Sequence, residues 1–266
     1  MGSKKARERE YARRRYAKQV ARMTRAQQRR RRYQMVALIT VGALVVGGGV
    51  TALLVTRDDG GPAATDTATD PFPVAPMPPP PDPALAEGRT WSGTIDLYQD
   101  GLYQDGAEGD PTAGTLQVEL DGAAAPQAVA SFVYLAQTGF FDGLTCHRLV
   151  DAEQFAVLQC GDPEGNGMGG PEYRFGPIEN APADDFYPAG TIAMARGSGD
   201  GASMGSQFFI VFADTVIPSD AAGGYTVFGH ITSGLDVVQQ IAATGILPDS
   251  ESTPASPVTI QKVETQ

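Results

Sequence analysis

Residues 205–215 have the sequence GSQFFIVFADT, and residues 225–238 have the sequence YTVFGHITSGLDVV. Each stretch contains a short apolar run rich in β-branched and aromatic residues, and we expect strands at 207–211 and 227–231. The apolar spacing after the second strand predicts a short helix at 235–243. These stretches therefore predict two strands followed by a helix.

The same pattern of short apolar runs and glycine-containing loops extends outward to about Arg89 and to the C-terminus. A helix is expected at 126–138, because Pro126 lies near its first position and Gly139 follows its end. Further strands are expected at 115–120, 145–150, 155–159, 191–195 and 258–263. Many short strands with two helices indicate a mostly-β fold, either a barrel or a sandwich.

Three further stretches accompany these two: SFVYLAQTGFFDGLTCHRLV, FAVLQCGDP and GTIAMA, at residues 131–150, 155–163 and 190–195. In their order and nearly in their spacing, all of them resemble a cyclophilin-type peptidyl-prolyl cis-trans isomerase. The resemblance runs from about residue 89 to residue 262. It implies an eight-stranded antiparallel barrel with two capping helices and a shallow groove on its outside. It implies no cofactor and no metal.

The groove residues follow from that resemblance, position by position. Arg148 matches the family's catalytic arginine, and Gln159 matches the glutamine that holds the substrate backbone. Phe208 is expected to face the barrel core, because adjacent strand residues point to opposite sides. Substrate-binding positions are expected at Ala156, Val157, Ala195, Phe209, Ile217 and Tyr225.

Isomerisation of an Xaa-Pro bond requires neither a nucleophile nor a metal. Rotation about the bond breaks amide resonance, with a barrier of about 18–20 kcal/mol. A cation or hydrogen-bond donor near the prolyl nitrogen stabilises the twisted amide selectively, because the nitrogen lone pair is free only in that state. We therefore expect an enzyme in which Arg148 acts without forming a covalent bond to the substrate.

Several positions depart from the family pattern. The family usually has Phe three residues before the glutamine, where this chain has Ala156, with Phe155 one position earlier. The usual groove tryptophan is absent, since Trp91 is the only Trp, and Tyr225 stands where the family usually has histidine. These departures leave an alternative open, a catalytically weak module that binds peptides or acts as a scaffold. We interpret His147 as structural.

Cys146 and Cys160 are the only cysteines, and they flank the hairpin that carries Arg148 and Gln159. Residues on two antiparallel strands lie close enough for a disulfide, and an exported location permits oxidation. We predict a disulfide between them, with two buried free thiols as the alternative. No zinc-ligand spacing is present, so we expect no metal site.

The chain's net charge of −11 is unevenly distributed. Residues 1–34 carry 14 of the 20 basic residues and two acidic ones, and the remaining residues carry −23. Between the two regions, residues 35–55 contain no charge. This run is long enough to cross a bilayer, and it lacks the polar stripe of a core helix and the short lead of a signal peptide. We predict a transmembrane helix at 35–56, with the basic segment 1–34 cytoplasmic and the remainder exported in a single-pass membrane protein.

Residues 57–88 are rich in proline, which predicts a disordered linker rather than a core; a ligand for a proline-binding module is the alternative. The cyclophilin-like domain is expected at 89–266, with an insertion at 99–111 in its first hairpin. The expected partners are the membrane, through residues 35–56, and proline-containing segments of exported proteins. We expect no nucleic-acid partner, although the basic segment alone has the charge for one, and we expect a monomer.

Overall fold

The computed structural model describes residues 77–101 and 110–266. The predicted basic segment, the predicted transmembrane helix, most of the predicted linker and most of the predicted insertion lie outside the described residues. Within the described ranges, no helix has the length and apolar character needed to cross a membrane.

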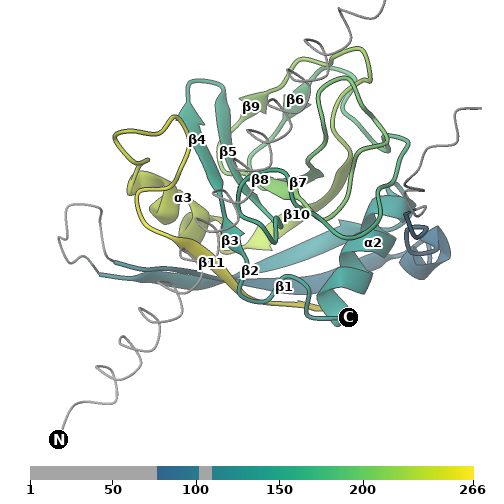
Figure 1. Cartoon of the computed structure of the whole chain (residues 1–266), viewed down its shortest axis with the longest axis horizontal. Helices are drawn as coiled ribbons and strands as arrows, with labels where there is room; N and C mark the ends of the chain where they lie inside the picture. The colour runs from purple at the N-terminus through teal and green to yellow at the C-terminus, as the bar shows by residue number, and fades with distance from the viewer. Residues whose placement is uncertain (1–76, 102–109) are drawn as a thin grey trace, which may run out of the picture. The chain divides into compact units, whose positions relative to one another are not determined.

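An antiparallel sheet of nine strands curls into a nearly closed barrel (Figure 1). Along the sheet the order is β3-β11-β1-β2-β10-β7-β8-β5-β4. The strands are β1 (Thr90–Gln99), β2 (Thr112–Asp121), β3 (Thr145–Cys146), β4 (Arg148–Ala152), β5 (Phe155–Cys160), β7 (Thr191–Met194), β8 (Phe208–Val211), β10 (Val227–Ser233) and β11 (Val258–Thr265).

The barrel has a seam at His147, between β3 and β4. Residues of β3 pair with β11, whereas β4 pairs with β5. The single strand predicted at 145–150 is therefore two strands, because the chain changes its pairing partner at this residue. This break explains why the sheet has nine strands where eight were expected.

In the described part of the chain, two α-helices pack against the barrel, α2 (Pro126–Gln137) and α3 (Leu235–Ala243). Phe132 on α2 is buried, and its ring centroid lies 5.0–5.4 Å from the ring centroids of Phe141, Phe208 and Phe228. The first residues of α2 have no side-chain cap of their own. Instead the Glu179 carboxylate accepts hydrogen bonds from two N–H groups of its first turn, each at 3.0 Å. A carboxylate at this end also interacts favourably with the helix dipole.

The structure corrects the end of the predicted linker, because residues 77–88 pack against the domain. A short 3-10 helix, η1 (Pro83–Ala86), buries Ala86 completely. The Trp91 indole donates to the Ala86 carbonyl at 3.0 Å, and Gln127 donates to the Pro81 carbonyl at 2.9 Å. The composition was linker-like, but these hydrogen bonds and the burial place the last prolines within the domain.

A second, two-stranded sheet was not predicted. It consists of β6 (Phe186–Tyr187) and β9 (Thr215–Val216), which are too short to show a periodic pattern. Strand β9 leads directly to Ile217, so this small sheet places one of the expected groove residues.

Strand β8 separates two apolar clusters. Phe208 and Ile210 are fully buried in the main core inside the barrel, which confirms the predicted orientation of Phe208. Phe209 and Val211 point the other way and join a smaller cluster with Val157. This second cluster forms the base of the candidate site.

Candidate functional site

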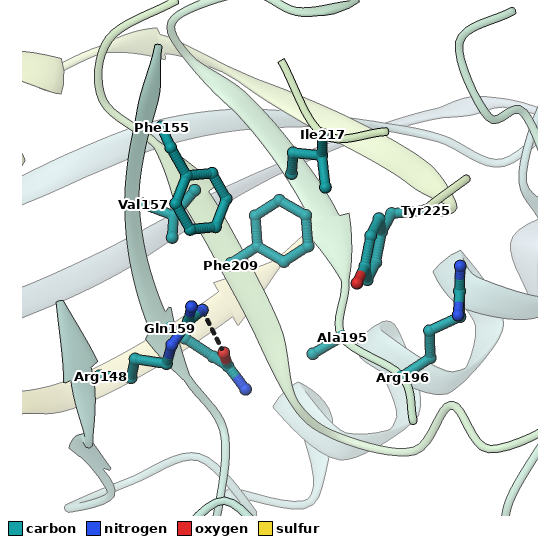
Figure 2. Close-up of a pocket in the computed structure, with 9 residues that line it drawn as sticks. All are labelled: Arg148, Phe155, Val157, Gln159, Ala195, Arg196, Phe209, Ile217 and Tyr225. Carbon is teal, nitrogen blue, oxygen red and sulfur yellow. Dashed lines mark hydrogen bonds between the residues drawn. The ribbon is translucent and has the colours of Figure 1, made fainter. Parts of the chain in front are cut away.

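A hollow of about 160 Å³ lies on the outside of the barrel, over β5 and β8 (Figure 2). Its walls come from β4, β5, β8, the chain after β7 and the segment that follows β9. The residues that line it are Arg148, Phe155, Val157, Gln159, Ala195, Arg196, Phe209, Ile217 and Tyr225.

The floor of the hollow is apolar. Phe209 is only 5% exposed, and Val157 is 1% exposed. The Tyr225 ring stands edge-on to Phe209, with ring centroids 5.5 Å apart, a favourable geometry for aromatic pairs. Ile217 and Phe155 complete the apolar walls. Such a surface suits a compact apolar ring such as that of proline.

A polar chain runs along one edge of the hollow. Arg148 and Gln159 are direct cross-strand partners of β4 and β5, and the Arg148 guanidinium donates to the Gln159 side-chain oxygen at 3.3 Å (Figure 2). The Gln159 amide donates to the Gln207 side-chain oxygen at 2.9 Å, and the Gln207 amide donates to the Gly169 carbonyl at 2.8 Å. This chain holds the Gln159 amide in one orientation.

The Arg148 guanidinium keeps most of its donors available. Within residues 77–101 and 110–266 it makes no ion pair, and the centre of its guanidinium group lies 5.6 Å from the Phe155 ring centroid. A half-buried cation at the edge of an apolar hollow interacts more strongly with a polar ligand group than it would in open solvent.

The opposite wall consists of Ala195, Arg196 and Tyr225. The Ala195 N–H already donates to the Gln207 carbonyl at 2.9 Å. The Arg196 side chain is 1% exposed and is paired with Asp220. Sequence reasoning did not identify Arg196, because a single arginine in a glycine- and serine-rich loop carries no distinctive pattern.

Seven of the eight predicted groove residues come together around the hollow; the exception is Ala156. The Ala156 side chain is 2% exposed and belongs to the main core inside the barrel. Side chains alternate along β5, so Phe155, Val157 and Gln159 face the hollow and Ala156 faces away. The assignment of Ala156 to the substrate-binding set is therefore corrected in favour of Phe155.

A disulfide joins Cys146 at the end of β3 to Cys160 at the end of β5, with Cα atoms 3.9 Å apart. Both residues are buried. The bond crosses the seam at His147, where the pairing of β3 with β11 ends and the pairing of β4 with β5 begins. It thus links covalently the two strands on either side of the change in pairing, next to Arg148 and Gln159.

His147 lies at the seam and is not among the residues that line the hollow. Its Nδ1 atom is buried and has no hydrogen-bond partner among the described residues. Burial lowers the pKa of His147 below its ordinary value; the Asp162 carboxylate acts in the opposite direction, and Arg148 adds to the lowering. Across the two described ranges, no group of three or more His, Cys, Asp or Glu side chains is arranged to hold a metal ion.

The family model for cyclophilin type peptidyl-prolyl cis-trans isomerase/CLD matches residues 108–265, more than half of the chain. The chain belongs to this family. The segment of the chain that matches the family model contains every residue that lines the hollow. The family match and the candidate site therefore lie in the same part of the molecule.

Individual relatives carry names that agree with this assignment. The chain is 43% identical over 162 residues to a probable peptidyl-prolyl cis-trans isomerase B of Mycobacterium tuberculosis, covering 56% of this chain and 51% of that protein. It is 38% identical over 135 residues to peptidyl-prolyl cis-trans isomerase B of Bacillus subtilis, covering 50% of this chain and 87% of that protein. The chain thus matches only about half the length of the mycobacterial relative.

A solved cyclophilin shares the fold. The crystal structure of a cyclophilin type peptidyl-prolyl cis-trans isomerase from Cryptosporidium parvum, determined in the presence of the dipeptide Ala-Pro, has a TM-score of 0.50 and 24% identity. The match covers 65% of this chain and 98% of that chain.

Proposed function

We propose that the protein is a peptidyl-prolyl cis-trans isomerase that acts on Xaa-Pro bonds of exported proteins. The observation that carries the proposal is the position of Arg148, a cation without an ion-pair partner in the described part of the chain, at the edge of an apolar hollow. The names of the M. tuberculosis and B. subtilis relatives support the same activity.

In the proposed mechanism the proline ring occupies the hollow over Phe209 and Val157. Arg148 donates a hydrogen bond to the prolyl nitrogen as the amide twists, when the nitrogen lone pair becomes available. Gln159, held by Gln207, binds a flanking carbonyl of the peptide. Since no bond to the protein forms or breaks, the rate increase comes only from stronger binding of the twisted amide than of the planar one.

The substrate class follows from the size and chemistry of the hollow. A volume of about 160 Å³ with an aromatic floor and apolar walls is large enough for one compact apolar ring such as that of proline. The crystal structure of the C. parvum protein in the presence of Ala-Pro supports a prolyl ligand for this fold.

A second candidate function is peptide binding with little catalysis. The observations that favour it are Tyr225 in place of the histidine expected from the family pattern, and Ile217 in a wall that lacks a tryptophan. In that case the hollow binds prolyl peptides, but Arg148 does not distinguish the twisted from the planar amide.

Nuclear magnetic resonance exchange spectroscopy separates these candidates. The full chain would be mixed with the peptide Ala-Ala-Pro-Ala amide, and both the cis–trans exchange rate and the binding-induced shifts would be measured. An isomerase raises the exchange rate far above the uncatalysed rate. Uncatalysed cis–trans isomerisation takes tens to hundreds of seconds. Binding-induced shifts together with an exchange rate no higher than the uncatalysed rate would exclude the isomerase and support the binding module.

We further propose that the domain is exported and anchored to the cell membrane by residues 35–56. The uncharged run at 35–55 and the opposite charges on its two sides support this topology. The full chain should float with vesicles in a density gradient, a variant lacking residues 35–56 should not, and a variant lacking residues 4–32 should still float. Loss of flotation on deletion of residues 4–32 alone would contradict the anchor.

A further inference from the structure

Arg196 differs from every other cation of the described domain in how completely its side chain is bonded. Its five N–H donors are all used: Nε donates to the Gly224 carbonyl, Nη1 to Gly197 and Asp220, and Nη2 to Gly223 and Asp220. The two bonds to the Asp220 carboxylate are both 2.9 Å long, the two-point geometry in which arginine pairs most strongly.

Asp220 extends this pair into the neighbouring loops. Its two carboxylate oxygens also accept hydrogen bonds from the N–H groups of Gly199, at 2.8 Å, and Ala222, at 2.9 Å. The hydrogen bonds from Arg196, and then those from the two backbone groups, hold the pKa of Asp220 well below its usual value. The pair therefore joins the loop after β7 to the loop before β10, and it stays charged at neutral pH.

The Arg196 guanidinium also lies against a wall of the hollow. Its central carbon is 4.6 Å from the Tyr225 ring centroid, a cation–π distance, while Phe209 contacts the same ring at 5.5 Å. Figure 2 shows the Tyr225 ring standing between Phe209 and Arg196. The Tyr225 backbone N–H is fixed separately, because it donates to the Tyr187 hydroxyl at 2.8 Å.

Arg196 cannot act on the substrate in the way proposed for Arg148. All of its donors are bonded within the protein, and its side chain is 1% exposed, so no N–H group remains for a peptide. Its guanidinium instead lies against the Tyr225 ring, which forms one wall of the hollow beside the floor residue Phe209.

We propose that Arg196 and Asp220 are positioning residues that fix Tyr225 as a wall of the proline-binding hollow and thereby set the affinity for prolyl peptides. This inference rests on the isomerase function proposed above. It assigns the pair to substrate binding rather than to the isomerisation step, so its loss should raise KM and leave kcat nearly unchanged.

The test uses Arg196→Lys and Asp220→Asn in the full chain. Lysine keeps the charge but loses the two-point pairing and the flat stacking surface, and asparagine keeps the size of Asp220 but removes its charge. The chain offers a matched control pair away from the hollow. Arg89 stacks 3.8 Å from the Trp91 ring centroid and pairs with Glu87 at 2.7 Å, so Arg89→Lys changes an ion pair of the same kind.

Three measurements would be made on each variant: the melting temperature, the affinity and exchange rate with Ala-Ala-Pro-Ala amide, and the nuclear Overhauser contacts between the Tyr225 and Phe209 rings. We expect KM to rise about tenfold in Arg196→Lys and Asp220→Asn, with kcat changed by less than about twofold and weaker ring contacts. Arg89→Lys should leave KM, kcat and the ring contacts unchanged.

A Tyr225→Ala background makes the inference falsifiable even if the single variants lose stability. Because the pair acts through Tyr225, Arg196→Lys should have little further effect on peptide affinity in that background. An equal loss of affinity in both backgrounds would overturn the proposal, as would unchanged KM and ring contacts in the single variants. If the wild type proves to be inactive, the isomerase function fails, whereas the affinity and ring contacts still test the positioning role.

Discussion

Arg148 and Arg196 line the same hollow, but their surroundings differ. Within the described ranges Arg148 donates one hydrogen bond, to Gln159, whereas all five donors of Arg196 are bonded to Asp220 and to loop carbonyls. The first side chain is therefore available to a substrate and the second is not. A motif comparison identifies only Arg148, because the contacts of Arg196 depend on Asp220, which lies in a different loop.

The two neighbours Phe155 and Ala156 should respond in opposite ways to substitution. Phe155→Ala removes a wall of the hollow, so we expect about a tenfold loss of affinity for prolyl peptides with a small change in stability. Ala156→Leu adds methylene groups inside the barrel, so we expect the free energy of unfolding to fall by about 1–3 kcal/mol. Peptide titration and urea unfolding measure the two effects, and the reverse result would restore Ala156 to the groove.

His147 should make stability depend on pH. Burial lowers its pKa in the folded chain, whereas the pKa of a histidine in the unfolded chain is about 6.5. The unfolded chain therefore binds the proton more readily. The stabilising effect of a neutral His147 is complete above about pH 6.5 and is lost as the pH falls towards the folded pKa. Asp162 and Arg148 are the charged groups that also act on this histidine.

Urea unfolding between about pH 7.5 and 5 checks this expectation. The free energy of unfolding of the wild type should decrease as the pH falls, and His147→Gln should make that decrease smaller. Thr232 is exposed and carries no titratable group, so Thr232→Gln serves as the control and should keep the wild-type slope. A slope unaffected by His147→Gln would contradict the account.

Among the structural elements, the seam at His147 is where the disulfide matters most. Cys146 and Cys160 are 14 residues apart, and closing a loop of that length contributes about 3 kcal/mol on the entropic model. We expect the Cys146→Ala, Cys160→Ala double variant to lose roughly that free energy of unfolding. Thiol labelling of the unfolded wild type, with and without reductant, is the control. Two reactive thiols without reductant would support the alternative of free cysteines.

The strands that were predictable from the sequence are those with a clear apolar run, such as β5 and β8. The period-two pattern also fixed the opposite orientations of Phe208 and Phe209. Applied strictly to β5, the same alternation would have placed Phe155 rather than Ala156 in the groove. The small β6–β9 sheet and the break at His147 were not predictable, because they depend on which distant strand each short segment meets.

At the scale of the whole molecule, the net charge of −11 combines a basic segment with an acidic remainder. The described domain contains few cations, which makes the position of each one informative. The Arg148 guanidinium faces the hollow, whereas the Arg196 side chain is buried and paired with Asp220. The monomeric state, the membrane anchor and the exported location remain predictions from the sequence.

The most direct test is the exchange rate of Ala-Ala-Pro-Ala amide with wild-type full chain, Arg148→Ala and Arg174→Ala. Arg174 is exposed and does not line the hollow, so its variant controls for the loss of a positive charge. We predict rapid exchange with wild type and Arg174→Ala, and a rate about 10²–10³-fold lower with Arg148→Ala. An Arg148→Ala variant that is as active as the wild type would contradict the proposed mechanism, and a wild type no faster than the uncatalysed reaction would contradict the isomerase function itself.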